Sequence, residues 1–371
     1  MRIRLLILLI LTGLSLFLSP VPADAQLLQD TTALNLVRKD INFIYNQQFK
    51  EAHEVYTKIT GLYPGHPIVF LLNGIMNYWE NYPLLHTSPT HDSFEDDMRQ
   101  CIRLSETGKN PAYEAEYLLA DLCARGMLLT FYDDNDNIME VIPLTTSTYK
   151  QLRRAFGFVT PYADLSYFTG IYKYYREAFP KIYPVYKSLA LLFPRGDMEA
   201  GLKELQSAAT GSVVLKAEAC FLLSGIYLGY ENKLPESLYY CRLLHEMYPE
   251  NVLYLSSYIK TLLLIKQYDE AEKLMTVSPG QEENKFFQAQ LIILKGILQE
   301  KRYHNFKLAI EYYDKGISDI SLFGKYGNEY AAYAYFGLSR VGDDNNEKHT
   351  RKIYRKEALK LADFKKINFD K

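Results

Sequence analysis

One pattern of large and small residues recurs in this chain at fixed separations. Its clearest copy consists of Phe221, Gly225, Leu228, Ser237, Cys241 and Pro249. An earlier copy, with the same separations throughout, consists of Leu36, Asp40, Phe43, Ala52, Tyr56 and Pro64. A small and a large residue four apart share one helix face, so the small one lets a sister helix approach and the large one fills the space beside it. The pattern therefore predicts helix pairs, stacked so that each pair buries its apolar face against its neighbours.

Further copies of the pattern follow toward the C-terminus. They are marked by residues 253–266 with YDEA at 268–271, by Gly296 with Ala309 and Tyr313, and by Tyr333, Phe336 and Gly337. A last helix, around residues 351–364, has a charged outer face, which suits the end of a stack. Strand-like alternation is almost absent, so the expected fold class is all-α.

The middle of the chain departs from the pattern. Residues 138–212 contain two apolar, Tyr-rich helices, around 162–178 and 183–192, which are bounded by prolines. The expected organisation is therefore residues 1–25 as a signal peptide, 26–137 as N-terminal helical hairpins, 138–212 as an irregular Tyr-rich section, and 213–371 as C-terminal repeats with a capping helix.

Over most of residues 32–365, the pattern resembles the tetratricopeptide-repeat (TPR) superfamily. The resemblance implies a right-handed α-solenoid of antiparallel helix hairpins. It also implies a non-catalytic scaffold that holds a peptide or a partner helix in the concave groove made by the first helices. The sequence departs from the family at Asp40 and Ile259, which occupy the usual glycine position. The copy at Ala309 needs a one-residue shift relative to Gly296, so the number of repeats stays open.

A second resemblance rests on the order of longer segments. Gly126 and an FTG run at 168–170 precede the run LLFPRGD at 191–197. This order is similar to that of the tetratricopeptide-type outer mitochondrial membrane proteins linked to inclusion clearance. No functional residue is transferred from that family.

The first residues have the form of a secretory signal. Arg2 and Arg4 precede an apolar run at 5–18, and small residues at 23–25 provide a cleavage pattern before Gln26. The apolar run is shorter than the roughly 20 residues that a membrane-spanning helix needs. We therefore expect an exported protein, periplasmic or secreted, with no transmembrane segment in the mature chain.

The charge of the chain argues against nucleic acid as a partner. The formal net charge is -2, whereas binding to nucleic acid needs a dense basic face. The basic stretch 348–371 is interrupted by Glu357, Asp363 and Asp370, as on a solvated helix face. The expected partner is a protein or peptide whose identity the sequence does not reveal.

The C-terminal copies predict a candidate groove. The positions expected to line it are apolar or aromatic: Leu222, Ile226, Tyr230, Leu263, Ala334 and Leu338. Such a groove would accept an apolar peptide, a helix or an acyl chain. The alternative is that tight superhelical curvature or a neighbouring unit buries these six residues.

Export draws attention to the four cysteines, because oxidising compartments permit disulfides. Cys220 and Cys241 lie on the two helices of the clearest hairpin, at similar heights above its turn. A disulfide between them is one hypothesis, and two small buried thiols are the other. Cys101 and Cys123 are placed less favourably for a bond.

Two polar clusters contain potential metal ligands. The first combines His86 and His91 with the acidic residues within 92–97, although carboxylates are favoured at a helix start in any case. The second, at 133–137, begins like a calcium loop but has Ile138 where the turn requires glycine. We expect a capped helix start and an exposed acidic turn, with no metal and no cofactor.

The sequence contains no motif that indicates catalysis, such as a phosphate loop, a nucleophile elbow or a His-Glu-x-x-His helix. The preferred function is a non-catalytic exported scaffold that binds a peptide or partner protein in a TPR groove. The alternative is a carrier of a hydrophobic small molecule or lipid, suggested by the Tyr-rich middle helices. A metal-dependent hydrolase that uses the loop of His86 and His91 is the third hypothesis.

Overall fold

The computed structural model describes residues 30–108, 111–159, 162–184, 187–276, 283–341 and 347–362. All regular structure in these residues is helical, without a strand among them, so the expected all-α class is confirmed. The predicted signal peptide, residues 1–25, lies outside the described residues. In the part of the chain that is described, no helix combines the length and the apolar character needed to cross a membrane.

Helices joined by short connections make up the chain. The N-terminal helices are α2 (Thr31–Tyr45), α3 (Phe49–Leu62), α4 (Pro67–Glu80), α5 (His91–Thr107), α6 (Glu114–Asp134), α7 (Ile138–Ala155), α8 (Ala163–Ile182), α9 (Lys187–Ala190) and α10 (Met198–Gly211). The C-terminal helices are α11 (Lys216–Gly225), α12 (Leu234–Met247), α13 (Val252–Leu264), α14 (Tyr268–Leu274), α15 (Lys285–Lys301), α16 (Phe306–Ile320), α17 (Asn328–Val341) and α18 (Glu347–Leu361). Among the described residues there are also the 3-10 helices η1 (Pro111–Tyr113) and η5 (Ser321–Gly327) and the π-helix η3 (Ile226–Tyr230).

N-cap side chains determine where many of the helices begin. Carboxylate or amide oxygens accept hydrogen bonds from first-turn N–H groups at Asp30, Asp197, Asn251, Asn284 and Asn305. These N–H groups have no partner inside the helix, so such a cap removes an unsatisfied donor. The helix starts are thus specified locally.

The Tyr-rich middle section contains less helix than the sequence pattern predicts. The expected helix at 162–178 is present as most of α8. Of the expected helix at 183–192, only the single turn α9 is present among the described residues. Pro184 and Pro194 bracket this segment, and a proline has no N–H with which to continue a helix.

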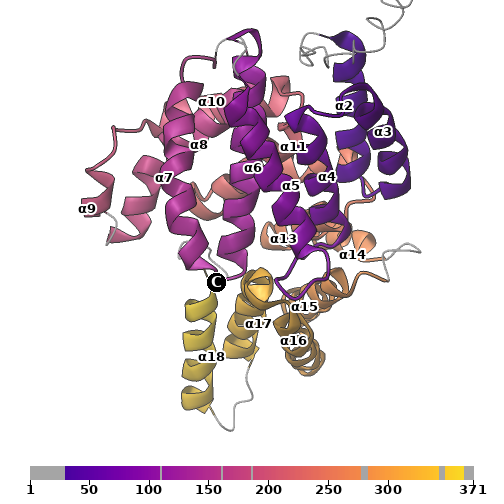
Figure 1. Cartoon of the computed structure of the whole chain (residues 1–371). Helices are drawn as coiled ribbons and strands as arrows, with labels where there is room; N and C mark the ends of the chain where they lie inside the picture. The colour runs from indigo at the N-terminus through magenta and orange to yellow at the C-terminus, as the bar shows by residue number, and fades with distance from the viewer. Residues whose placement is uncertain are drawn as a thin grey trace, which may run out of the picture.

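The helices stack in a regular order. Most consecutive helices pack against each other, and further contacts skip one helix, joining α2 to α4, α4 to α6, α8 to α10, α13 to α15, and α15 to α17. Two hydrophobic cores result. The first core consists of residues from α2 to α12 together with Tyr254 of α13, and the second consists of residues from α12 to α18. Figure 1 shows α15 to α18 at one end of the molecule, below the helices of the first core.

Tyr313 of α16 is enclosed by two glycines of the neighbouring helices. A Cβ atom added at Gly296 of α15 would lie 2.8 Å from the Tyr313 ring, and one added at Gly337 of α17 would lie 2.3 Å from it. Tyr313 is fully buried, and its hydroxyl donates a hydrogen bond to Glu300 at 2.7 Å. The two missing side chains therefore let three helices pack around one phenol.

We predict that Gly337→Ala lowers the free energy of unfolding by about 1–3 kcal/mol, because the added methyl group overpacks the space that Tyr313 fills. Gly225→Ala is the matched control. Gly225 has helical backbone angles and no neighbouring atom within 4 Å of an added Cβ, so alanine should be neutral or stabilise by up to about 1 kcal/mol. Urea unfolding measures both changes. Equal shifts in the two variants would contradict the packing argument.

The first core closes on itself, since the turn between α2 and α3 meets the turn between α12 and α13. The Asn251 amide donates to the backbone oxygen of Tyr45 at 2.7 Å, and the backbone N–H of Glu250 donates to the Asn46 side chain at 3.1 Å. The Gln48 amide also donates to the Glu250 carboxylate at 2.8 Å. These contacts join residues about 200 apart in sequence, and they close the helices α2 to α13 around an interior space.

A second set of contacts joins the C-terminal helices to the first core. The Tyr326 hydroxyl donates to the backbone oxygen of Leu84 at 3.1 Å. The Lys325 ammonium donates to the backbone oxygen of Asp133 at 2.8 Å and pairs with its carboxylate at 2.9 Å. The second core is therefore fixed against the loops at the ends of α4 and α6.

The four cysteines are present as buried, free thiols. Cys241 lies 3.5 Å from the hydroxyl of Thr261, and Cys220 faces the backbone oxygen of Ala209 at 4.0 Å. The hypothetical disulfide between Cys220 and Cys241 is therefore not formed in this structure. The thiols belong to the packing of α11 and α12 with their neighbours.

Candidate functional site

The six residues of the candidate groove lie in both cores. Ile226 is buried in the first core, whereas Leu263, Ala334 and Leu338 are buried in the second. Leu222 and Tyr230 are partly buried and pack against the first core. The structure therefore does not bring the six together on one open surface.

The two polar clusters have structural partners. The backbone N–H of His86 donates to the Asn135 side chain at 3.0 Å, and the Asn135 amide donates to the backbone oxygen of Leu84 at 3.1 Å. The His86 ring packs edge-on against Phe131 with ring centres 4.9 Å apart. In the described ranges, no group of three or more His, Cys, Asp or Glu side chains is placed to hold a metal ion.

A large apolar cavity occupies the interior space of the first core. Its volume is about 650 Å³, which lies within the range of about 300–1,000 Å³ typical of small-molecule sites. Its aromatic lining includes Tyr45, Tyr78, Trp79, Tyr149, Tyr167, Phe168, Tyr172, Tyr175, Phe221 and Tyr254. The aliphatic lining includes Leu122 and Met127 of α6, and Val214 and Leu215 of the segment before α11. The cavity thus offers large ring surfaces to an apolar ligand.

One group of contacting rings in the lining comes from α2, α4 and α13. The Trp79 ring lies edge-on to Tyr45 at 5.5 Å between ring centres, and edge-on to Tyr254 at 5.9 Å. It also stacks on Tyr82 at 5.5 Å. Phe221 of α11 also contacts Tyr254, with ring centres 5.9 Å apart. We call this group of rings, with the polar groups among them, the inner end of the cavity.

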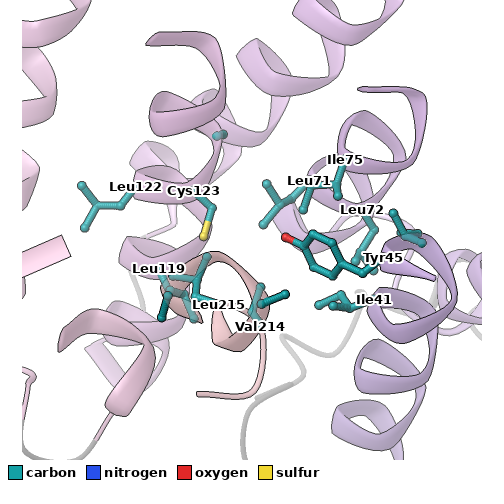
Figure 2. Packing of buried hydrophobic residues seen from close by; sticks show 14 of the residues in the cluster. Ile41, Tyr45, Leu71, Leu72, Ile75, Leu119, Leu122, Cys123, Val214 and Leu215 are labelled. Carbon is teal, nitrogen blue, oxygen red and sulfur yellow. The ribbon is translucent and has the colours of Figure 1, made fainter. Parts of the chain in front are cut away.

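Glu218 supplies an acidic group at the inner end. It lies in the first turn of α11, lines the cavity, and accepts a hydrogen bond from the Tyr45 hydroxyl at 2.7 Å. Figure 2 shows the Tyr45 ring leaving α2 with its hydroxyl directed toward the side of Cys123 and Leu215. Burial raises the pKa of Glu218, and the bond from Tyr45 partly opposes that shift. A carboxylate in such surroundings attracts a cation or a hydrogen-bond donor.

Tyr254 adds a second polar group at the inner end. Its side chain is only 1% exposed and its hydroxyl has no hydrogen-bond partner among the described residues. Burial, followed by the nearby charge of Glu218, raises the pKa of this phenol. A buried hydroxyl without a partner is rare in proteins, so this one points to a bound group or a water molecule.

The position of Glu218 depends on a buried anchor. The carboxylate of Asp164 accepts hydrogen bonds from the backbone N–H groups of Val213 at 2.9 Å, Val214 at 2.8 Å and Leu215 at 2.9 Å. Val214 and Leu215 line the cavity, and Leu215 is the residue from which α11 starts. Asp164 therefore fixes both a wall of the cavity and the helix that presents Glu218.

The lining also includes an acidic residue at the end of α6, Asp134, and a basic residue on α8, Arg176. Arg176 donates a hydrogen bond to the backbone oxygen of Phe193 at 3.2 Å and pairs with Glu177 at 3.1 Å. At a rise of 1.5 Å per residue, it lies about 13 Å along α8 from Tyr167. Arg176 is thus separated along α8 from Tyr167, whose pKa is raised by burial and, to a smaller extent, by the charge of Glu218.

The sequence indicates this site only indirectly. The Tyr-rich composition of residues 162–178 is the one signal that points to it, because α8 contributes Tyr167, Phe168, Tyr172 and Tyr175 to the lining. Glu218 and Tyr254 have no local motif. They become neighbours only through the packing of α11 against α12 and of α12 against α13.

No protein-family model matches the chain, and no curated protein matches it either. What the cavity binds must therefore be argued from the residues that line it.

Proposed function

We propose that this protein is an exported, non-catalytic binding protein, built as a right-handed TPR-like solenoid, that holds a hydrophobic small molecule or lipid in its aromatic cavity. The observation that supports the ligand is the cavity of about 650 Å³ with its apolar lining. The contacts that skip one helix, from α2 to α4 to α6 and from α13 to α15 to α17, support the TPR-like architecture. The form of residues 1–25 supports export.

The physical reason to expect a ligand is that the apolar side chains lining the cavity lack packing contacts on the side that faces the empty space. Protein interiors are close-packed, and rings that face an empty space lose the dispersion contacts that a neighbour would provide. An apolar ligand recovers these contacts and contributes roughly 25 cal/mol for each Å² of apolar surface that leaves water. The closed path of α2 to α13 restricts the occupant to a small molecule or a chain of similar width.

A partner protein is the second candidate, favoured by exposed apolar side chains on α7. Ile138, Met139 and Ile142 are all largely exposed there. Such a partner would have to contact residues other than the four buried members of the candidate groove. Crosslinking followed by mass spectrometry would recover one dominant protein if this candidate is right. Native mass spectrometry of gently purified protein would instead show a small bound mass if the cavity is the site.

We predict that Gly126→Phe weakens the binding of diphenylhexatriene, a neutral probe that fluoresces in apolar sites, by about tenfold or more, equivalent to about 1.4 kcal/mol. Gly126 lines the cavity on α6, and an added Cβ would meet its nearest neighbour, Phe168, only at 3.9 Å. A phenyl group at this position would therefore occupy ligand space. Gly126→Ala is the size control and should bind as the wild type does. Unchanged titration of Gly126→Phe, or a wild type that does not bind the probe, would refute cavity binding.

A further inference from the structure

We propose that the cavity recognises an amphiphilic amine, whose ammonium group lies between the Glu218 carboxylate and the hydroxyl groups of Tyr45 and Tyr254. This inference rests on the proposed function, because it names the chemical class of the ligand in the same cavity. The apolar remainder of the ligand, an alkyl or aryl body, lies against the surrounding rings.

The first observation behind this inference is a half-buried acidic group without a counter-charge. Glu218 lies in an apolar cavity and accepts a hydrogen bond from Tyr45, but it forms no ion pair with any described residue. Burying an ionised carboxylate is unfavourable unless a cation or several donors compensate it. A ligand ammonium supplies both the opposite charge and the donors.

The second observation is the unpartnered hydroxyl of Tyr254. It is independent of the first, because it concerns a different helix and a different kind of atom. A primary ammonium has three N–H donors. Glu218 can accept one of them, and the phenolic oxygens of Tyr45 and Tyr254 can accept the others. The number of acceptors at the inner end therefore suits a primary amine.

The third observation is the arrangement of rings around these acceptors. Trp79 lies within 6 Å, centre to centre, of both Tyr45 and Tyr254, and Phe221 also approaches Tyr254. Aromatic faces attract cations within about 6 Å of the ring centre, and tryptophan does so best. The same rings that would bury an alkyl body thus also favour a positive head group.

Other head groups suit the inner end less well. A carboxylate or phosphate would be repelled by Glu218, and the cationic side chain in the lining, Arg176, is already paired with Glu177 at 3.1 Å. An alcohol would form hydrogen bonds but would leave the charge of Glu218 uncompensated. The arrangement therefore discriminates by charge as well as by shape.

The pH dependence of binding follows from the groups that face Glu218. The titratable side chains close enough to feel its charge are Tyr45 of α2, Cys123 of α6, Tyr167 of α8, Tyr248 at the end of α12, and Tyr254 of α13. Burial raises the pKa of every one of them, so they stay neutral near pH 7. Glu218 is then the only one of these groups to change charge in mildly acidic solution, and its protonation weakens amine binding.

The test compares three dodecyl compounds below their micelle concentrations: dodecylamine, dodecanol and dodecanoic acid. Each displaces diphenylhexatriene from the full-length protein at pH 7. We expect dodecylamine to bind at least about tenfold more tightly than dodecanol, and dodecanoic acid to bind most weakly. The amine preference should decrease as the pH is lowered through the pKa of Glu218. Equal affinity for amine and alcohol, or tightest binding of the acid, would overturn the amine assignment while leaving cavity binding intact.

Variants locate the preference within the cavity. Glu218→Gln should reduce the ratio of amine to alcohol affinity to about one, and Glu199→Gln, at a side chain that is 80% exposed on α10, should retain the wild-type ratio. Tyr254→Phe removes one acceptor and should lower the ratio of amine to alcohol affinity several-fold. This variant tests the amine assignment if Glu218→Gln does not fold. A ratio that stays at the wild-type value in Glu218→Gln or Tyr254→Phe refutes the assignment. Failure of the probe and all three compounds to bind refutes the proposed function instead.

Discussion

Raising the pH from about 4 to about 8 should lower the free energy of unfolding by up to about 5 kcal/mol through the single residue Asp40. Its side chain is 0% exposed, and both carboxylate oxygens are buried without a hydrogen-bond partner among the described residues. Burial raises the pKa of this carboxyl to about 8. In the unfolded chain the same group titrates near its ordinary value of about 3.9.

The sign follows from proton binding in the two states. Between about pH 4 and pH 8 the folded protein keeps the Asp40 proton and the unfolded chain has lost it, so folding takes up a proton. Stability then falls as the pH rises through this window and levels off above the folded pKa. Other carboxylates also contribute to the profile of the wild type. The contribution of Asp40 is therefore obtained as the difference in unfolding free energy between the wild type and a variant that lacks this carboxyl.

Asp40→Asn isolates this contribution, because the amide has nearly the same size and no charge at any pH. The two proteins should have similar stability near pH 4, and the variant should be the more stable by several kcal/mol near pH 9. Urea unfolding at closely spaced pH values measures the difference. Parallel profiles for wild type and variant would show that Asp40 is ionised in the folded protein, and would contradict the argument.

The second large effect concerns Asp164, whose replacement by alanine should destabilise the protein by about 3–5 kcal/mol. The substitution leaves the backbone N–H groups of Val213, Val214 and Leu215 without their acceptor. A donor left unsatisfied in a buried site costs about 1–3 kcal/mol. Because Val214 and Leu215 line the cavity, the variant should also bind diphenylhexatriene more weakly.

Asp164→Asn provides a graded control. The Oδ1 atom accepts from Val214 and Leu215, and the Oδ2 atom accepts from Val213. An asparagine whose oxygen replaces Oδ1 keeps two of the bonds and loses one, so we expect a loss of about 1–3 kcal/mol. Chemical denaturation should therefore rank the wild type above Asp164→Asn and Asp164→Ala last. Equal stability of both variants, or a loss below about 1 kcal/mol for alanine, would mean that water replaces the carboxylate.

Several packing details could be predicted from the repeat pattern, although not at every copy. Gly296 and Gly337 occupy repeat positions and do contact a buried aromatic residue, Tyr313. Gly225 occupies the same kind of position in the clearest copy and has no close neighbour. Asp40 stands at this position in the first copy, and there the chain buries a carboxyl instead. A degenerate motif thus predicts the helix pairing better than it predicts individual contacts.

The candidate groove illustrates what local periodicity leaves out. The spacing of Ile226, Leu263 and Ala334 indicates which face of each helix is apolar, and all three are indeed buried. Spacing does not reveal which apolar face meets a partner and which meets another part of the same chain. The cavity that we propose as the binding site is instead lined by residues from seven helices that no single repeat contains.

The amino-acid sequence by itself determined that this chain is helical, roughly where the helices begin, and that neighbouring helices pair, because caps, prolines and apolar spacing act over a few residues. Only the tertiary structure decided that the turn after α2 meets the turn before α13, through hydrogen bonds such as that from Asn251 to Tyr45. That closure creates the cavity and places Glu218 beside Tyr45 and Tyr254. Contacts between residues about 200 apart depend on the accumulated curvature of the whole stack, which no local pattern specifies.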